Sequence, residues 1–203
     1  RFDANQMNTH DSRASVVIVN WNAGTQLAEA VSSIDAHHHD LVSSVVIVDN
    51  ASTDNSLARV EALRHVGFDL QVVRNQSNRG FAAACNQGAA LAQGEFILFL
   101  NPDTRLFPDS LVKAIDFMRQ PEHAEVGICG IRLVDQAGNT SISAARFPTV
   151  RVMAGTTLGL SRLFPKVFPA HLMSASELTN SRRVDQVIGA FFFIRTQQRE
   201  SAR

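Results

Sequence analysis

The sequence predicts an α/β fold in which a mostly parallel sheet is flanked by helices. Short apolar and β-branched runs alternate with helical patterns as far as Met118, an order typical of parallel strands joined by crossover helices. Three of the apolar runs end abruptly in clusters of amides, hydroxyls and carboxylates. In an open α/β sheet such strand ends lie along one edge, where ligands bind. We therefore expect a single polar cleft at that edge.

Each element of this fold follows from a local pattern. Strands are expected where β-branched or aromatic residues run without interruption, and helices where apolar residues recur every three or four positions. Three consecutive histidines, 37–39, do not share a helix face and are expected in a solvated loop. The expected strands cover 14–19, 45–48, 68–73, 96–100, 126–134 and 184–194; the expected helices cover 25–34, 55–65, 82–92 and a stretch from Pro108; and 140–146 is expected to pair back as a hairpin.

Composition excludes several classes of protein. The 203 residues, 45% of them hydrophobic, suit one domain with a sizeable core. Lys plus Arg and Asp plus Glu both number 19, so there is no overall basic field to favour nucleic acid. Cys85 and Cys129 lack the spacing of a metal site and are expected to be buried free thiols. No apolar run is long enough to cross a membrane, and 1–13 is expected to be a disordered leader.

The second expected strand ends in the densest polar cluster, from Asp49 to Ser56. Helix capping by Ser52, Thr53 or Asp54 explains part of it. It does not explain Asp49, which stands at the last strand position and can accept bonds from a base or a ribose. Asn86 is also unusual, because asparagine is mildly unfavourable within a helix. Either a ligand or a neighbouring loop could hold its side chain.

The fourth expected strand ends in Asn101, Pro102 and Asp103. Pro102 cannot continue a central ladder, so the strand stops there. A carboxylate at this edge can hold a hard divalent cation, and the cation can hold a diphosphate. A plain strand-to-turn corner is an equally weighted alternative, because all three residues favour turns.

Other nucleotide-binding motifs are absent from the sequence. It contains no G-x-G-x-x-G, no G-x-x-x-x-G-K-[ST] and no G-x-S-x-G. A nucleotide site would therefore consist of side-chain carboxylates and a cation, with no glycine cradle for the phosphates.

Four ordered motifs resemble those of the family 2 inverting glycosyltransferases of the GT-A fold, and most closely their bacterial rhamnosyltransferase-type branch. The resemblance covers about Ser15 to Arg195. The motifs are Val16-Val17-Ile18-Val19-Asn20-Trp21-Asn22, Val46-Ile47-Val48-Asp49-Asn50-Ala51-Ser52-Thr53-Asp54, Asn78-Arg79-Gly80-Phe81-Ala82 with Asn86, and Leu98-Phe99-Leu100-Asn101-Pro102-Asp103.

The resemblance implies a role for each of these residues. Asp103 would bind Mg²⁺ or Mn²⁺, which bridges the donor diphosphate. Asn101 stands where the family has a first aspartate and adds no charge, so weak metal affinity is expected without donor. Gly189 and Ala190, small residues in the last strand, are expected on the acceptor side. Nucleotide-binding residues would be Asn20, Asn22, Asp49, Asp54, Arg79, Gly80, Asn86 and Asn101.

The catalytic base is not identified in this sequence. The family carries it in an acidic segment after the last strand, and residues 196–203 contain no such motif. The base is therefore expected beyond Arg203, and the chain is expected to be truncated. Two functions stay open: transfer of a sugar with inversion, or donor binding without turnover. A nucleotidyltransferase is less favoured, because the loop after the first strand has no Lys or Arg.

The resemblance also implies partners and a location. The donor would be dTDP-rhamnose or a UDP-sugar, and the acceptor a glycan or lipid-linked glycan of the bacterial cell envelope. No nucleic-acid partner is expected. The location would be cytoplasmic, at the inner face of the membrane. The apolar and basic residues 164–169 could touch the lipid surface, although a flap over the sheet is favoured for them. Residues 14–118 would form the nucleotide-binding half and 119–203 a partial acceptor half of one domain.

Overall fold

The computed structural model describes residues 13–63, 65–164 and 166–196. The chain divides into two compact units. The first runs to Cys129 and resumes at Gly189, and the second is Gly130–Ile188. Apart from Arg13, the expected leader lies outside the described residues. The functional halves expected to meet at residue 118 stay a prediction.

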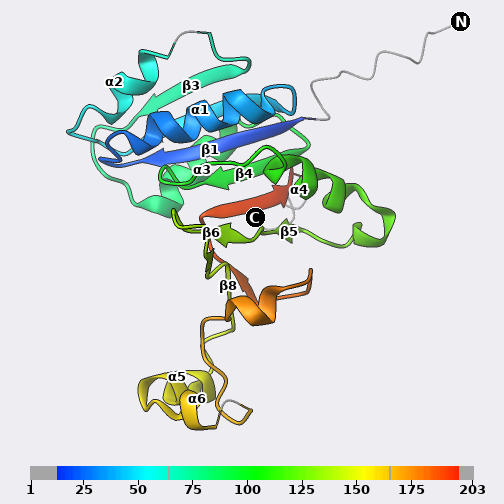
Figure 1. Cartoon of the computed structure of the whole chain (residues 1–203). Helices are drawn as coiled ribbons and strands as arrows, with labels where there is room; N and C mark the ends of the chain where they lie inside the picture. Colours follow the sequence, from blue (N-terminus) through cyan, green and yellow to red (C-terminus); the bar gives the residue numbers. More distant parts are fainter. Residues whose placement is uncertain (1–12, 64, 165, 197–203) are drawn as a thin grey trace, which may run out of the picture. The chain divides into compact units, whose positions relative to one another are not determined.

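A six-stranded sheet with the order β3-β2-β1-β4-β10-β5 forms the first unit (Figure 1). The first four strands in the chain pair in parallel, and β10 runs antiparallel between β4 and β5. This confirms the α/β fold with a mostly parallel sheet. The strands are β1 Ala14–Asn20, β2 Val42–Asp49, β3 Asp69–Arg74, β4 Phe96–Leu100, β5 Ile128–Cys129 and β10 Phe191–Arg195.

Helices cover both faces of this sheet. The helix α3 packs on one face, where Ala84 and Ala89 join a core with alternate residues of the central strands, including Val17 and Val46. The intervening strand residues point to the opposite face, where α1 and α2 lie side by side (Figure 1). The helices of this unit are α1 Gln26–His38, α2 Ser56–Glu61, α3 Phe81–Leu91, α4 Ser110–Arg119 and the 3₁₀ turn η1 Pro121–His123.

Contact between α3 and the sheet is closest at Gly88. A Cβ atom at this position would lie 2.4 Å from Cγ1 of Val17. Real Cβ atoms do not approach side chains so closely, so only glycine lets the helix rest at this height above β1.

The histidine stretch departs from the expected loop. Helix α1 continues through His38, so His37 and His38 form its last turn. His38 is buried, and its Nε2 lies 2.9 Å from the carbonyl oxygen of Phe107. Burial lowers the pKa of His38, because desolvation disfavours the charged imidazolium. The prediction of a loop is therefore wrong for both residues, whereas the prediction of solvent exposure is wrong for His38 and holds for His37.

Two expected strands are each divided in the structure. The segment 126–134 forms β5 and β6 (Leu133–Val134), which belong to different sheets. The chain leaves the main sheet at Gly130, where a Cβ would lie 2.3 Å from Cγ1 of Val187. The segment 184–194 likewise forms β9 (Gln186–Val187) and β10.

The second unit contains two short sheets and two helices. The expected hairpin is confirmed in its first part, where β6 pairs antiparallel with β7 (Thr140–Ser141). Its second part, β8 (Ala144–Ala145), pairs with β9 instead. The helical elements are α5 Val150–Thr157, α6 Leu160–Leu163 and the 3₁₀ turn η2 Ala175–Leu178.

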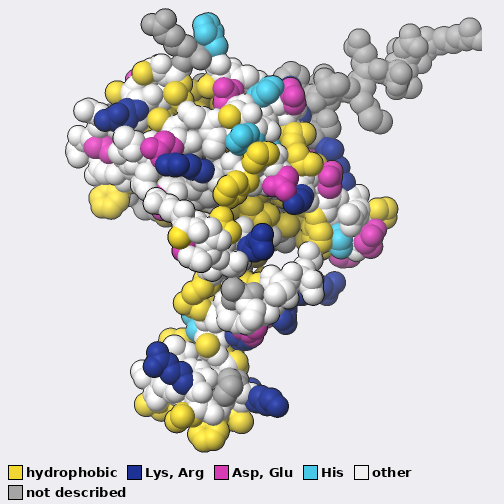
Figure 2. Space-filling model, in the orientation of Figure 1, with side chains coloured by type: hydrophobic (Ala, Val, Ile, Leu, Met, Phe, Trp, Pro, Cys, Tyr) yellow, Lys and Arg dark blue, Asp and Glu magenta, His cyan; other side chains and the backbone are white. Residues whose placement is uncertain are grey.

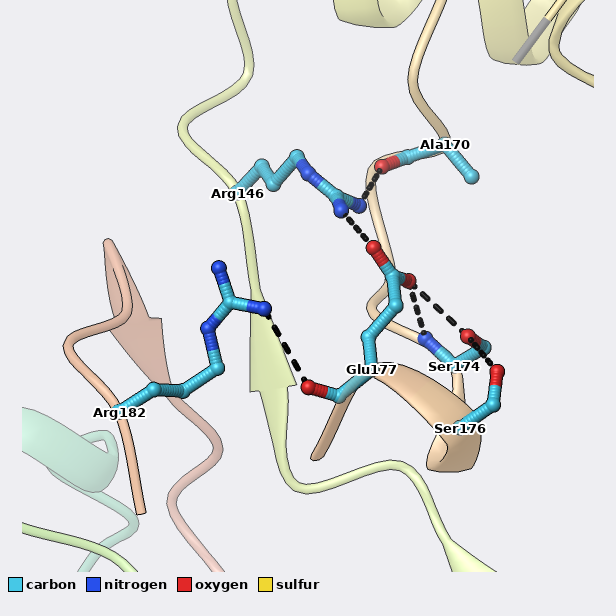
Figure 3. Close-up of polar contacts among 6 residues, drawn as sticks. All are labelled: Arg146, Ala170, Ser174, Ser176, Glu177 and Arg182. Atoms are coloured by element: carbon cyan, nitrogen blue, oxygen red, sulfur yellow. Dashed lines mark hydrogen bonds and ion pairs between the residues drawn. The ribbon is translucent and has the colours of Figure 1, made fainter. Parts of the chain in front are cut away.

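A cluster of polar contacts joins η2 to Arg146, the residue after β8 (Figure 3). The guanidinium of Arg146 pairs with the carboxylate of Glu177 and donates to the Ala170 carbonyl at 2.8 Å. The backbone N–H and hydroxyl of Ser174 also donate to Glu177. These bonds lower the pKa of Glu177, the backbone bond from Ser174 most of all.

Across the described ranges, no helix has both the length and the apolar character that crossing a bilayer requires.

Candidate functional site

The carboxyl ends of the four parallel strands lie at one edge of the main sheet. Asn20 on β1 is level with Asp49 on β2, and Asp49 is level with Arg74 on β3. On the other side of β1, Leu100 is level with Ile18. The polar loops that follow these strands therefore start from the same edge, as the sequence predicts.

Asn20 is the internal anchor of this edge. Its side chain is fully buried, and its amide nitrogen lies 2.6 Å from Oδ1 of Asp49. The same nitrogen lies within 3.0 Å of the hydroxyl oxygens of Ser52 and Ser56. Its Oδ1 atom finds no hydrogen-bond partner within the described part of the chain. The structure thus places Asn20 behind the edge, where it orients Asp49 and the loop after β2.

Asp49 is held from two sides. Besides the Asn20 amide, its carboxylate accepts the backbone N–H of Ser52 at 3.3 Å. Only 7% of the residue is exposed. These contacts fix the direction of the carboxylate before any ligand arrives.

Asn22 and Asp54 join the loop after β1 to the loop after β2. Asn22, at φ 53°, accepts the backbone N–H of Thr53 at 2.7 Å on its side-chain oxygen. Asp54 accepts the backbone N–H of Gly24 at 2.8 Å, and both the N–H and the hydroxyl of Ser56. The Ser56 hydroxyl bond is the main reason that the pKa of Asp54 is lowered. The N-cap of α2 is Asn55, which makes no side-chain cap bond, so Asp54 binds the first N–H of the helix from one residue further out and also joins the two loops.

Sequence reasoning missed a network of amides that extends this edge to β3 and α3. The side-chain oxygen of Asn50 accepts the Asn75 amide at 3.1 Å and the backbone N–H of Arg79 at 3.0 Å. The Asn50 amide donates to Asn78 at 2.8 Å. Asn75 and Gln87 exchange two bonds, at 2.9 and 3.0 Å. The one available signal was the position of Asn50, directly after a strand.

The predicted donor loop is placed by these amides. Arg79 is exposed, and its backbone rather than its side chain makes the contact with Asn50. Gly80 adopts φ 83° at the N-terminus of α3 and donates its N–H to Asn78. Asn86 is exposed and has no side-chain hydrogen bond among the described residues. Its neighbour Gln87 makes the contact with the loop instead.

The fourth strand end is built differently. The backbone N–H of Asn101 donates to the carbonyl of Ala190 at 3.2 Å, so the turn that contains Gly189 and Ala190 adjoins Asn101. The backbone of Asn101 also accepts Thr104 N–H at 3.1 Å, which closes a turn. The corner alternative is therefore correct for the backbone. The carboxylate of Asp103 is exposed and has no side-chain hydrogen bond within the described ranges.

Asp103 is the residue that the sequence predicts as the metal ligand at this edge. The described residues contain no group of three or more His, Cys, Asp or Glu side chains arranged to hold a metal. One free carboxylate fits a hard cation only when other oxygens complete the coordination. The chemistry of Asp103 therefore fits a cation that arrives with a diphosphate. The base expected beyond Arg203 lies outside the described residues.

Comparison with known proteins agrees with this architecture. Residues 15–175 match the family model described as glycosyl transferase family 2. An uncharacterized glycosyltransferase of Nostoc sp. strain PCC 7120 is 30% identical over 131 residues, covering 62% of this chain and 40% of that protein. The putative teichuronic acid biosynthesis glycosyltransferase TuaG of Bacillus subtilis is 29% identical over 126 residues, covering 61% of this chain and 48% of TuaG.

Solved structures share the fold. TarS 1–349 of S. aureus, in complex with UDP, superposes with a TM-score of 0.63 at 20% identity, covering 94% of this chain and 48% of that one. The mannosyltransferase PcManGT of Pyrobaculum calidifontis, in complex with GDP-Man and Mn²⁺, gives a TM-score of 0.59 at 20% identity, covering 94% and 46%. The chain spans less than half the length of each of these four proteins.

Proposed function

Since this chain belongs to glycosyl transferase family 2, we propose that it transfers a sugar from a nucleoside diphosphate donor to a hydroxyl group of a glycan or lipid-linked glycan. Its fold is that of the GT-A glycosyltransferases, as the superpositions show. One observation carries the proposal for this edge. Asp49 is fixed by internal bonds at the end of β2, whereas the Asp103 carboxylate after β4 is free to bind a ligand.

The roles of the two carboxylates follow from this difference. Asp49, held in one direction, suits the directional hydrogen bonds of a base or ribose. Asp103 would hold Mg²⁺ or Mn²⁺ together with the donor, and the cation would neutralise the leaving diphosphate. The acceptor hydroxyl gives its proton to a carboxylate base and attacks the opposite face of the sugar. A single displacement of this kind inverts the anomeric centre.

The donor within this proposal is dTDP-rhamnose or a UDP-sugar. The motif resemblance favours the rhamnosyltransferase-type branch, and the TarS structures contain UDP and UDP-GlcNAc. The PcManGT structure contains GDP-Man and Mn²⁺, which supports a metal-assisted reaction. TuaG is named for teichuronic acid biosynthesis, which supports a cell-envelope polysaccharide as the product.

Nucleotide titration tests the donor-binding part of the proposal. Trp21 is the one tryptophan of the chain, lies between Asn20 and Asn22, and is 60% exposed. Its fluorescence should therefore report a nucleotide at this edge. We expect saturable changes with UDP or dTDP that are stronger with Mn²⁺, and a smaller response to GDP. Equal, non-saturable responses to all three nucleotides would overturn the proposal.

A further inference from the structure

The helices α5 and α6, with the residues flanking them, expose an apolar surface that the proposed function does not use. Val150 is 86% exposed, Leu163 73% and Leu158 70%. We call this surface the helix-pair face. Its other apolar members, each at least 45% exposed, are Phe147, Met153, Phe164, Val167 and Leu172.

These exposed residues are not the core of the helix pair. That core lies on the other side of α5, where Val152 and Gly155 are buried. A Cβ on Gly155 would lie 2.7 Å from Cβ of Phe168, so α5 and the chain after α6 are already in close contact. The hydroxyl of Ser161 ties the pair further by donating to the Gly155 carbonyl at 3.3 Å. The helix pair therefore has its own packed interior, and the residues of the helix-pair face remain exposed outside it.

The segment itself carries only basic charges, and the carboxylate of Asp185 accepts the backbone N–H of Phe147 at 3.1 Å. Residues 147–176 include Arg151, Arg162 and Lys166 and contain no Asp or Glu. The first carboxylate beyond them, Glu177, is paired with Arg146 (Figure 3). In the space-filling view, yellow and dark blue side chains lie around the visible α5–α6 region among white atoms, and no magenta appears on it (Figure 2).

We propose that the helix-pair face docks on the surface of an anionic phospholipid bilayer. Exposed apolar side chains beside Lys and Arg, without acidic residues, are the combination that lies at the boundary between headgroups and acyl chains. The apolar side chains enter that boundary, while the long basic side chains reach the lipid phosphates. With eight and four residues, α5 and α6 lie on the bilayer and do not span it. This inference is independent of the proposed nucleotide site.

Vesicle co-sedimentation of the 203-residue chain tests the inference. Phosphatidylcholine vesicles are compared with vesicles in which about a third of the lipid is phosphatidylserine. We expect binding to the anionic vesicles that weakens about fivefold for each cation removed in Arg162→Gln and Lys166→Gln, since each basic residue contributes on that scale. The double variant Leu163→Ser/Phe164→Ser should lose binding, because it removes two apolar anchors. Both residues are exposed, so the fold should survive their replacement.

Matched controls come from the first unit. Phe107→Ser removes an aromatic ring that is 59% exposed, and Arg59→Gln removes an exposed cation on α2. Both should bind vesicles as the unaltered chain does. No binding to anionic vesicles, or equal binding by all variants, would overturn the inference. So would concentration-dependent dimerisation that the Leu163→Ser/Phe164→Ser variant abolishes, because a second copy would then cover the face. Nucleotide titration of the same variants separates this result from the proposed function.

Discussion

The ends of β2 and β4 present two carboxylates in opposite surroundings. Asp49 is nearly buried and accepts bonds from Asn20 and from the backbone of Ser52. Asp103 is exposed, with no side-chain hydrogen bond among the described residues. A carboxylate that accepts hydrogen bonds from the protein is held in one orientation, whereas a carboxylate without such bonds can turn toward a ligand. The difference shows that one edge of the sheet can combine a carboxylate held by the protein with a carboxylate exposed to solvent.

Removing each carboxylate should produce the largest effects. In Asp103→Ala we expect the Mn²⁺-dependent part of nucleotide affinity to fall by about tenfold or more, because the variant removes the proposed carboxylate ligand of the metal. In Asp49→Ala we expect loss of binding with or without Mn²⁺, because its proposed partner is the base or ribose. Trp21 fluorescence titration measures both, and Asp116→Ala, an exposed carboxylate on α4, is the control. Full Mn²⁺ dependence in Asp103→Ala would remove that residue from the metal site.

Substitution of two asparagines at strand ends should affect the free energy of unfolding by different amounts. Asn20→Ala should lower the free energy of unfolding by about 3 kcal/mol, because it leaves buried partners of its amide unsatisfied. Asn101→Ala should cost less than about 1 kcal/mol, because the bonds of Asn101 run through its backbone. Urea unfolding compares the two variants. Equal losses would show that Asn20 is not the anchor of the edge.

The amide pair between the β3 loop and α3 should show measurable coupling. A double-mutant cycle of Asn75→Ala and Gln87→Ala should give an interaction energy of about 1 kcal/mol, since two reciprocal bonds join the side chains. A second cycle, of Asn75→Ala and Asn86→Ala, is the matched control, and its interaction energy should be within about 0.5 kcal/mol of zero. Coupling of the same size in both cycles would mean that the bonds do not act as a pair.

Acid should weaken the tie made by Asp54. The pKa of Asp54 is lowered in the fold, mainly by the Ser56 hydroxyl. A lowered pKa stabilises the fold above the ordinary value of 3.8, and this contribution is lost as the pH falls through the folded pKa. Asp54→Asn should therefore be less stable than the unaltered chain at pH 6, and the gap should close below about pH 3.8. A gap that stays constant in pH-dependent thermal unfolding would contradict this.

The smallest effect on stability is expected at Asn86. Asn86→Ala should raise the free energy of unfolding by about 0.5 kcal/mol, because alanine is the better helix former and no described side-chain bond is lost. Thermal unfolding measures this change. Nucleotide titration of the same variant decides its role: weaker binding would support the predicted donor contact, and unchanged binding would exclude it.

The main sheet was predictable because its strands are long apolar runs. β1, β2 and β4 each contain an uninterrupted apolar stretch, at 16–19, 45–48 and 96–100, and the polar residues after them follow from where those stretches stop. The divided strands were not predictable in the same way. At Gly130 the division arises from contact with Val187, more than fifty residues away, which no local pattern encodes.

The sequence predicted which edge of the sheet carries these residues, but not the hydrogen bonds that they make. Asn20 and Asp49 could be placed at one edge because each follows or ends an apolar strand of a sheet expected to be parallel. The inward direction of Asn20 depends on side-chain geometry, and so do the bonds by which Asn50, Asn75 and Gln87 join two loops to α3. Amides in loops follow no periodic pattern, so their partners appear only once the loops are in place.

The missing side chain at Gly88 has a consequence for the whole edge. A single methyl group there would collide with Val17 and lift α3 from the sheet. The same helix begins directly after Arg79 and Gly80, so its height sets the level of the loop that the resemblance assigns to the donor. A substitution such as Gly88→Ala, at a buried position, should therefore shift the position of that loop.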